Sequence, residues 1–197
     1  MKPLEKILPS HAFLFLSRLE HAIQIAQNEK QGDESVYLVG GTARLLASGL
    51  TSEREVTDID ILVTNNPDVV KRMSEILRDS STPIEELSSC AGQKFEVGGI
   101  KCDIFGNDFQ KWIKGAPCHG DMLAIDFHTG EVRINSEFIG RAPYDVNPNC
   151  NADGDKAIGY MKEHRNKLAR DARLVEAIRG KIDANIFADP YSLGPLL

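Results

Sequence analysis

Apolar residues recur along much of the chain at intervals of three and four positions, which is the spacing of one face of an α-helix. This pattern predicts three amphipathic helices, over 10–29, 67–78 and 155–183, and two short helices, over 42–48 and 108–114. The apolar stripe of the last long helix continues through its whole length. We therefore expect a single long helix near the C-terminus.

Strands are predicted where apolar and polar residues alternate, or where turn residues bound a short apolar run. These segments are 36–39, 57–63 and two hairpins, over 95–105 and 122–135. Gly98-Gly99 is a two-residue turn at the centre of the first hairpin. Helices and strands alternate before the two hairpins, and this order predicts an α/β (α+β) fold in which helices flank a mixed β-sheet.

A loop rich in proline, asparagine and aspartate, over 141–153, separates the last hairpin from the long helix. It divides the 197-residue chain into a core over 1–140 and a C-terminal segment over 141–197 that contains the loop and the helix. A chain of this length buries roughly 70% of its unfolded surface, so its fold needs neither disulfides nor a structural metal.

The composition is that of a globular protein, with 42% hydrophobic and 26% charged residues. No apolar run approaches the roughly 20 residues of a membrane helix. The four cysteines are scattered and contain no CxxC pair, which predicts free thiols and a cytoplasmic location. Cys118 and His119 are neighbours, but they lack a second pair of ligands, so we interpret them as core or surface residues rather than as a zinc site.

Charge is unevenly distributed over the chain, whose net charge is −6. Residues 156–181 contain eight Lys or Arg and three acidic residues and so carry +5, which leaves −11 on the rest. The cations of this helix that lie largely away from its apolar stripe are Lys162, Lys167, Arg170 and Arg173. They form either a surface for an anionic partner or a face that pairs with the acidic body.

A glycine pair joins the strand over 36–39 to the helix that follows it. Gly40 and Gly41 let the backbone approach a bulky anion, and the first amides of a helix point unpaired N–H groups at such an anion. A tight turn without a ligand also explains the pair. Neither a GxGxxG fingerprint nor the GK[ST] of a P-loop is present.

Asp58 and Asp60 lie two residues apart in the strand over 57–63, so both carboxylates project from one face of the sheet. At a separation of about 4 Å two such charges repel by ~4 kcal/mol at an effective dielectric constant of 20. A divalent cation would remove this repulsion, and oxygen ligands suit Mg²⁺ or Mn²⁺. Solubilising acids on an edge strand are the alternative, but Ile59 and Ile61 on the opposite face favour a strand within the sheet.

A third carboxylate, Asp103, is isolated within the apolar second strand of the first hairpin. If the turn at Gly98-Gly99 sets the register, Lys94 lies opposite Asp103. Asp103 is then either a metal ligand or one half of a cross-strand ion pair. We favour the ligand, because Asp58 and Asp60 already indicate a metal site.

Together these residues resemble the motif of the DNA polymerase beta-like nucleotidyltransferase superfamily. That motif is a glycine pair at a strand–helix turn, a DxD on the following strand and a third carboxylate on a later strand. The stretch from Gly40 to Ala43 is most similar to the transferase-type toxins of abortive-infection systems. Arg44 is similar to the CCA-adding and minimal nucleotidyltransferases. The resemblance covers residues 36–105.

The resemblance implies an enzyme that moves a nucleoside monophosphate from an NTP to a hydroxyl group and releases pyrophosphate. It implies that Asp58, Asp60 and Asp103 are catalytic and hold two Mg²⁺ or Mn²⁺ ions. The residues implied to bind the nucleotide are Gly40, Gly41, Thr42, Arg44 and Lys94.

The resemblance is compatible with three acceptors, namely RNA, a protein side chain or a small molecule. It leaves open whether the protein belongs to a toxin–antitoxin pair. The alternative is a nucleotidyltransferase fold without activity that serves as an antitoxin or regulatory partner. Metal-dependent NTP binding separates the two. No membrane partner is expected, and the sequence does not indicate an oligomeric state.

Overall fold

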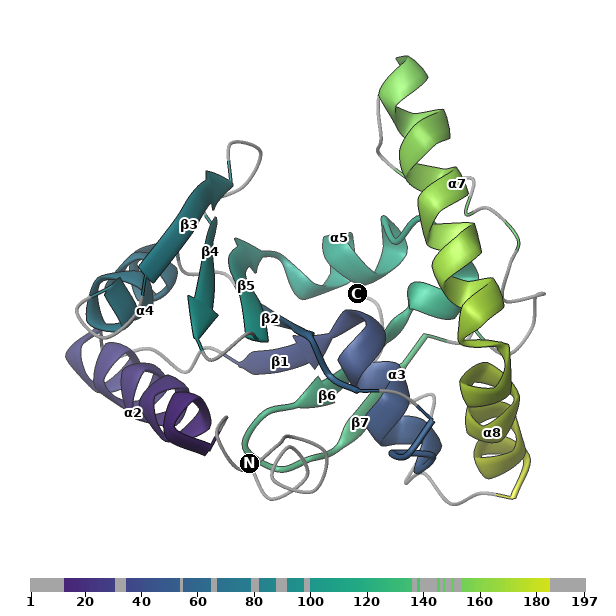
Figure 1. Ribbon diagram of the computed structural model, residues 1–197, viewed down its shortest axis with the longest axis horizontal. Helices are drawn as coiled ribbons and strands as arrows, with labels where there is room; N and C mark the ends of the chain where they lie inside the picture. Colours follow the sequence, from purple (N-terminus) through teal and green to yellow (C-terminus); the bar gives the residue numbers. More distant parts are fainter. Residues whose placement is uncertain are drawn as a thin grey trace.

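The computed structural model describes most of the chain, over residues 13–30, 35–53, 55–64, 67–78, 82–87, 92–97, 100–135, 138, 145, 147, 150 and 154–184. Figure 1 shows helices arranged around a central sheet. In chain order the elements are α2 (Phe13–Lys30), β1 (Val36–Val39), α3 (Gly40–Ser48), β2 (Asp58–Thr64), α4 (Pro67–Arg78), β3 (Thr82–Leu87), β4 (Gly92–Val97), β5 (Ile100–Asn107), α5 (Phe109–Lys114), η2 (His119–Asp121), β6 (Leu123–Asp126), β7 (Val132–Ile134), α7 (Gly154–Arg170) and α8 (Ala172–Asp183).

The seven strands form one mixed sheet in the order β3-β4-β5-β2-β1-β6-β7. Strands β2 and β5 run parallel, and all other neighbouring pairs are antiparallel. Strand β2 therefore lies inside the sheet between β1 and β5, as its two-sided pattern predicted. The mixed α/β sheet expected from the sequence is confirmed.

The main core lies on the face of the sheet that carries Ile59, Ile61 and Val63 of β2, all of which are fully buried. Helix α4 packs on β4 and β5, and α2 packs on α4. Helix α3 packs on β2 and β6, and α8 covers α3 (Figure 1). These contacts bury the apolar faces that the helical spacing predicted.

The opposite face of the sheet carries the polar residues of β2 and a second, smaller apolar cluster of Val39, Leu62 and Ala124. Helix α5 covers this cluster, and the ring of Phe109 stacks on that of Tyr37 with 4.5 Å between the centroids. This face of the sheet is where Asp58, Asp60 and Asp103 project.

Two elements differ from the sequence prediction. Strand β3 was not predicted, because Pro83 and the acids that follow it interrupt any apolar alternation; β3 is an edge strand, where proline is tolerated. The single long C-terminal helix is instead two helices, α7 and α8, that meet at Asp171. The side chain of Asp171 is buried and bound to Arg44, and its backbone, with φ = −88° and ψ = 13°, departs from helical values.

Several expectations lie outside the described residues, namely the start of the first helix before Phe13, the turn at Gly98-Gly99 and most of the loop over 141–153. No helix in the described part of the chain is both long enough and apolar enough to cross a membrane. Cys118 and His119 are both buried, as expected for core residues.

Candidate active site

The glycine pair forms an abrupt junction between β1 and α3. Helix α3 begins at Gly40, directly after the last residue of β1, and Gly40 has φ = 69°, in the left-handed region that favours glycine. A Cβ atom at Gly40 would collide with Oδ2 of Asp60. Thr42 Oγ1 donates a hydrogen bond of 2.5 Å to the carbonyl oxygen of Asp58. The turn is thus fitted directly against the DxD strand.

Replacing Gly40 with alanine is expected to lower the free energy of unfolding by about 1–3 kcal/mol, because of its backbone conformation and the collision with Asp60. Gly180→Ala in α8 is the control, since a Cβ there meets no atom within 4 Å. That substitution should instead stabilise the protein by about 0.5–1 kcal/mol. Urea unfolding of both variants measures the difference, and equal effects would show that the junction is not constrained.

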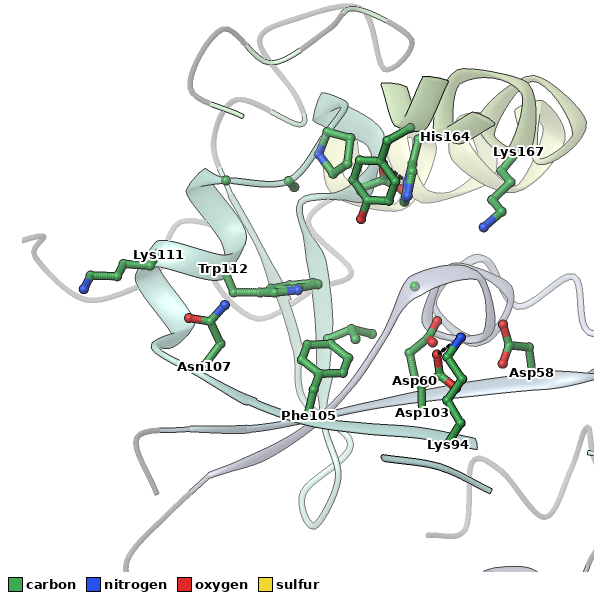
Figure 2. Close-up of a pocket in the computed structure, with 17 residues that line it drawn as sticks. Asp58, Asp60, Lys94, Asp103, Phe105, Asn107, Lys111, Trp112, His164 and Lys167 are labelled. Carbon is green, nitrogen blue, oxygen red and sulfur yellow. Dashed lines mark hydrogen bonds and ion pairs between the residues drawn. The ribbon is translucent and has the colours of Figure 1, made fainter. Parts of the chain in front are cut away.

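The three predicted carboxylates come together on one face of the sheet. Asp58 and Asp60 project from β2, and Asp103 of β5 lies beside Asp60 in the parallel register. All three line one cleft together with Gly40. Figure 2 shows Asp60 and Asp103 close together and Asp58 next to them, below α7.

Burial and repulsion from neighbouring carboxylates make Asp58 and Asp60 hard to ionise. Burial, followed by repulsion from Asp58 and then Asp103, raises the pKa of Asp60 to about 7. Burial and then Asp103 also raise the pKa of Asp58, an effect that Lys167 and Lys94 partly offset. The site therefore favours an added positive charge at neutral pH.

Lys94 supplies part of that charge. Its Nζ lies 3.1 Å from Oδ2 of Asp103, and the two residues face each other in the register that the sequence predicted. Within the described ranges, no three His, Cys, Asp or Glu side chains are grouped closely enough to hold a metal ion. All three side chains offer carboxylate oxygens, which are the ligands that a hard divalent cation takes.

Arg44 lies beneath the site, with only 4% of its side chain exposed. Its Nη1 lies 2.8 Å from Oδ1 of Asp121, and its Nη2 lies 3.0 Å from Oδ2 of Asp171. The second oxygen of Asp121 lies 3.0 Å from Nδ1 of His164. The resemblance implied that Arg44 binds the nucleotide, but in the structure two carboxylates bind its guanidinium. The resulting network joins α3 to η2, α7 and the start of α8.

Sequence reasoning did not identify Asp121, His164 or Asp171. Only Asp171 carried a signal, because it lies three residues after Leu168 and four before Val175 and so occupies the apolar stripe. A carboxylate at such a buried position requires a partner. No comparable pattern in the sequence points to Asp121 or His164.

Two adjoining clefts meet at the carboxylates. The larger, of about 480 Å³, extends from Gly40 and the acids across β5 to α5. The smaller, of about 240 Å³, lies between the N-terminus of α3 and α7. His164 and Lys167 of α7 border both clefts. In Figure 2 the Lys167 side chain extends from α7 toward Asp58.

The basic face predicted on the C-terminal helix is divided in the structure. Lys167 and Arg170 line the smaller cleft, whereas Lys162 is exposed elsewhere on α7. Arg173 pairs with Glu53 of the body, with its Nη1 3.0 Å from Oε1. Arg173 thus pairs with the body, as one interpretation expects, whereas Lys167 pairs within α7, with its Nζ 2.9 Å from Oε1 of Glu163.

Comparison with solved structures shows which fold this is. No family model matches the chain, and no curated protein resembles it significantly. It is similar to a CCA-adding enzyme in apo form I, with 20% identity and a TM-score of 0.50 over 91% of this chain and 40% of that one. A CCA-adding enzyme in complex with ATP has 21% identity and a TM-score of 0.47 over 64% of this chain and 29% of that one. The Thermotoga maritima CCA-adding enzyme complexed with tRNA_CCA has 17% identity and a TM-score of 0.47 over 94% and 53%.

The chain therefore has the fold of the CCA-adding enzyme in apo form I, as the resemblance in its sequence predicted. It spans 29–53% of the length of these three structures. At this level of identity the likeness is one of fold. What the chain does depends on its own residues.

Proposed function

We propose that this protein is a metal-dependent nucleotidyltransferase that transfers a nucleoside monophosphate from an NTP to a hydroxyl group of an acceptor. The observation that carries this proposal is the arrangement of Asp58, Asp60 and Asp103 on one face of the sheet, against the glycine turn at the start of α3. Carboxylates with raised pKa values are suited to a cation, and the adjoining helix N-terminus is suited to an anion.

The reaction forms a bond from the acceptor oxygen to the α-phosphorus and breaks the bond from that phosphorus to the bridging oxygen, so that pyrophosphate leaves. Mg²⁺ or Mn²⁺ held by Asp58, Asp60 and Asp103 would make the acceptor hydroxyl more acidic and would neutralise charge on the phosphates. The amides at Gly40, Gly41 and Thr42 are available to bind the phosphates in the smaller cleft.

Lys167 is the cation that we assign to the triphosphate. It borders both clefts, and its charge lowers the pKa values of Asp58 and Asp60. Lys94 neutralises Asp103 in the structure described here and lines the same cleft. We assign Arg44 a positioning role, since its two ion pairs hold α3 and the C-terminal helices together under the site.

Lys167→Met is expected to weaken NTP binding by about tenfold, because it removes one charge-assisted contact to phosphate. Lys162→Met is the matched control, since Lys162 is exposed on the same helix and lines neither cleft. Calorimetric titration with NTP and Mg²⁺ measures both affinities. Equal affinities for the two variants would remove Lys167 from the site.

The acceptor class can be identified directly. The protein is incubated with each of the four α-labelled NTPs, Mg²⁺ or Mn²⁺, and either total RNA or cell lysate. A labelled RNA band, a labelled protein band or a labelled small molecule identifies the acceptor. Absence of any labelled species with all four NTPs would contradict the proposal.

A second candidate function is a binding module with this fold and without activity. The observation that favours it is the Lys94–Asp103 ion pair, which occupies one of the three carboxylates. The two candidates differ in metal dependence. An enzyme should bind NTP more tightly when Mg²⁺ is added, whereas a module whose third acid stays paired with Lys94 should show no such change.

A further inference from the structure

The larger cleft continues beyond the carboxylates into a region that contains none of the residues assigned to the metal or to the phosphates. This far part is lined by two aromatic side chains, Phe105 and Trp112, and two polar ones, Asn107 and Lys111. Phe105 and Trp112 are each partly exposed, although they also pack on the small apolar cluster under α5. Figure 2 shows the four residues gathered on the side of the cleft away from Lys167.

The register of β5 places these residues in line with the acids. Asp103, Phe105 and Asn107 alternate along one face of the strand, opposite Asp60, Leu62 and Thr64 of β2. At about 3.3 Å per residue, Phe105 lies roughly 7 Å and Asn107 roughly 13 Å along the strand from Asp103. A ribose separates a nucleobase from its reacting phosphate or hydroxyl group by a similar span.

Helix α5 carries the opposite wall of this part of the cleft. Asp108 caps the helix by accepting a 2.8 Å hydrogen bond from the amide of Lys111. Phe109 fixes the helix to the sheet by stacking on Tyr37. Trp112, one turn later, lies over the cluster with part of its ring facing the cleft. The indole is therefore held in position without being fully covered.

We propose that Phe105 and Trp112 form a binding site for a nucleobase, with the amide of Asn107 at the base edge. Flat aromatic side chains beside polar groups bind bases through stacking, and an amide can both donate to and accept from the edge of a base. This inference rests on the proposed function, because it places the base next to the site of transfer. The base belongs either to the NTP or to the acceptor strand.

Trp112 is the only tryptophan of the chain, so its fluorescence reports on this site alone. The wild-type protein is titrated in Mg²⁺ with an NTP, with inorganic triphosphate and with a short oligoribonucleotide. Stacking of a base on the indole should quench the emission, whereas inorganic triphosphate should bind without quenching it. Quenching by the NTP assigns the base to the NTP, and quenching by the oligonucleotide alone assigns it to the acceptor.

Variants then separate stacking from packing. Trp112→Leu should weaken binding of the quenching ligand by about tenfold to a hundredfold in calorimetry, while Trp112→Phe retains most of the affinity. Phe109→Leu is the matched control, because Phe109 stabilises α5 but does not line the cleft. It should change the affinity for the base much less than Trp112→Leu does, because leucine still packs α5 on the sheet. Affinity for inorganic triphosphate should be the same in all four proteins.

Three results would overturn the inference. If NTP and inorganic triphosphate bind equally and neither NTP nor oligonucleotide quenches Trp112, the site does not bind a base, and the proposed transfer function still holds. If neither NTP nor inorganic triphosphate binds at all, the proposed function fails together with this inference. Equal loss of affinity in Trp112→Leu and Phe109→Leu would also overturn it, since packing alone would then explain the effect.

Discussion

Replacing Asp60 with asparagine is expected to reduce nucleotidyl transfer at least about a thousandfold and, at the same time, to stabilise the fold at neutral pH. Asparagine keeps the size of the side chain and removes the charge that a cation requires. Burial and the two neighbouring acids make the ionised Asp60 costly, as its pKa of about 7 indicates. The gain in the free energy of unfolding should be about 1–3 kcal/mol once solvent screening in the open cleft is considered.

The stabilisation should depend on pH in a defined way. The ordinary pKa of Asp60 is 3.8, and it rises to about 7 in the folded protein. Between these values the native state holds a proton that the unfolded state has lost, so the stability of the wild type falls as pH rises through this window. Asp60→Asn should therefore match the wild type near pH 4 and exceed it above pH 7. Thermal unfolding without divalent ions, at several pH values, measures this difference.

Asp183→Asn serves as the control, since Asp183 is exposed at the end of α8. It should leave transfer unchanged and alter stability by less than about 0.5 kcal/mol. Added Mg²⁺ should raise the melting temperature of the wild type but not that of Asp60→Asn. A variant that is as active as the wild type, or equally stabilised at pH 4 and pH 8, would contradict the assignment of Asp60.

Replacing Arg44 with methionine is expected to lower the free energy of unfolding by about 3–5 kcal/mol. Methionine fills similar space but removes the guanidinium that binds the buried carboxylates of Asp121 and Asp171. An unpaired buried charge costs far more than the net worth of the ion pair that it replaces. Urea unfolding gives the change directly.

Arg72→Met provides a matched comparison. Arg72 also forms a close pair, with its Nε 2.6 Å from Oε2 of Glu29, but that pair is accessible to solvent. Its loss should cost far less stability than the loss of Arg44, because solvent screens an exposed ion pair. Adding Asp121→Asn and Asp171→Asn to Arg44→Met should recover part of the lost stability, because both side chains that the guanidinium binds are then uncharged. Equal costs for Arg44→Met and Arg72→Met would show that the buried network does not hold the C-terminal helices.

Local patterns in the sequence were sufficient for the parts of the fold that depend on neighbouring residues. The alternation in β2 predicted both its place inside the sheet and the shared face of Asp58 and Asp60. The glycine turn at residues 98 and 99 predicted the register that brings Lys94 opposite Asp103. Both follow from the two-residue period of a strand, which does not depend on distant parts of the chain.

Features that depend on distant residues could not be predicted in the same way. The partners of Arg44 lie 77 and 127 positions further along the chain, and no spacing rule connects them. Both Gly40 and Gly41 were predicted from the sequence to let the backbone approach an anion. The fold requires glycine at Gly40, because Asp60 lies against it. The positive φ of Gly40 and the packing of β2 against the turn distinguish the two.

Transfer of a labelled nucleotide tests the central claim most directly. The wild type and Asp60→Asn are incubated with Mg²⁺ and the acceptor fraction, together with NTP labelled either at the α-phosphate or at the γ-phosphate. Our account predicts that only the α label reaches an acceptor, that pyrophosphate is released in equal amount, and that Asp60→Asn transfers almost none. Transfer of the γ label, transfer by Asp60→Asn at the wild-type rate, or no transfer from any of the four NTPs would contradict it.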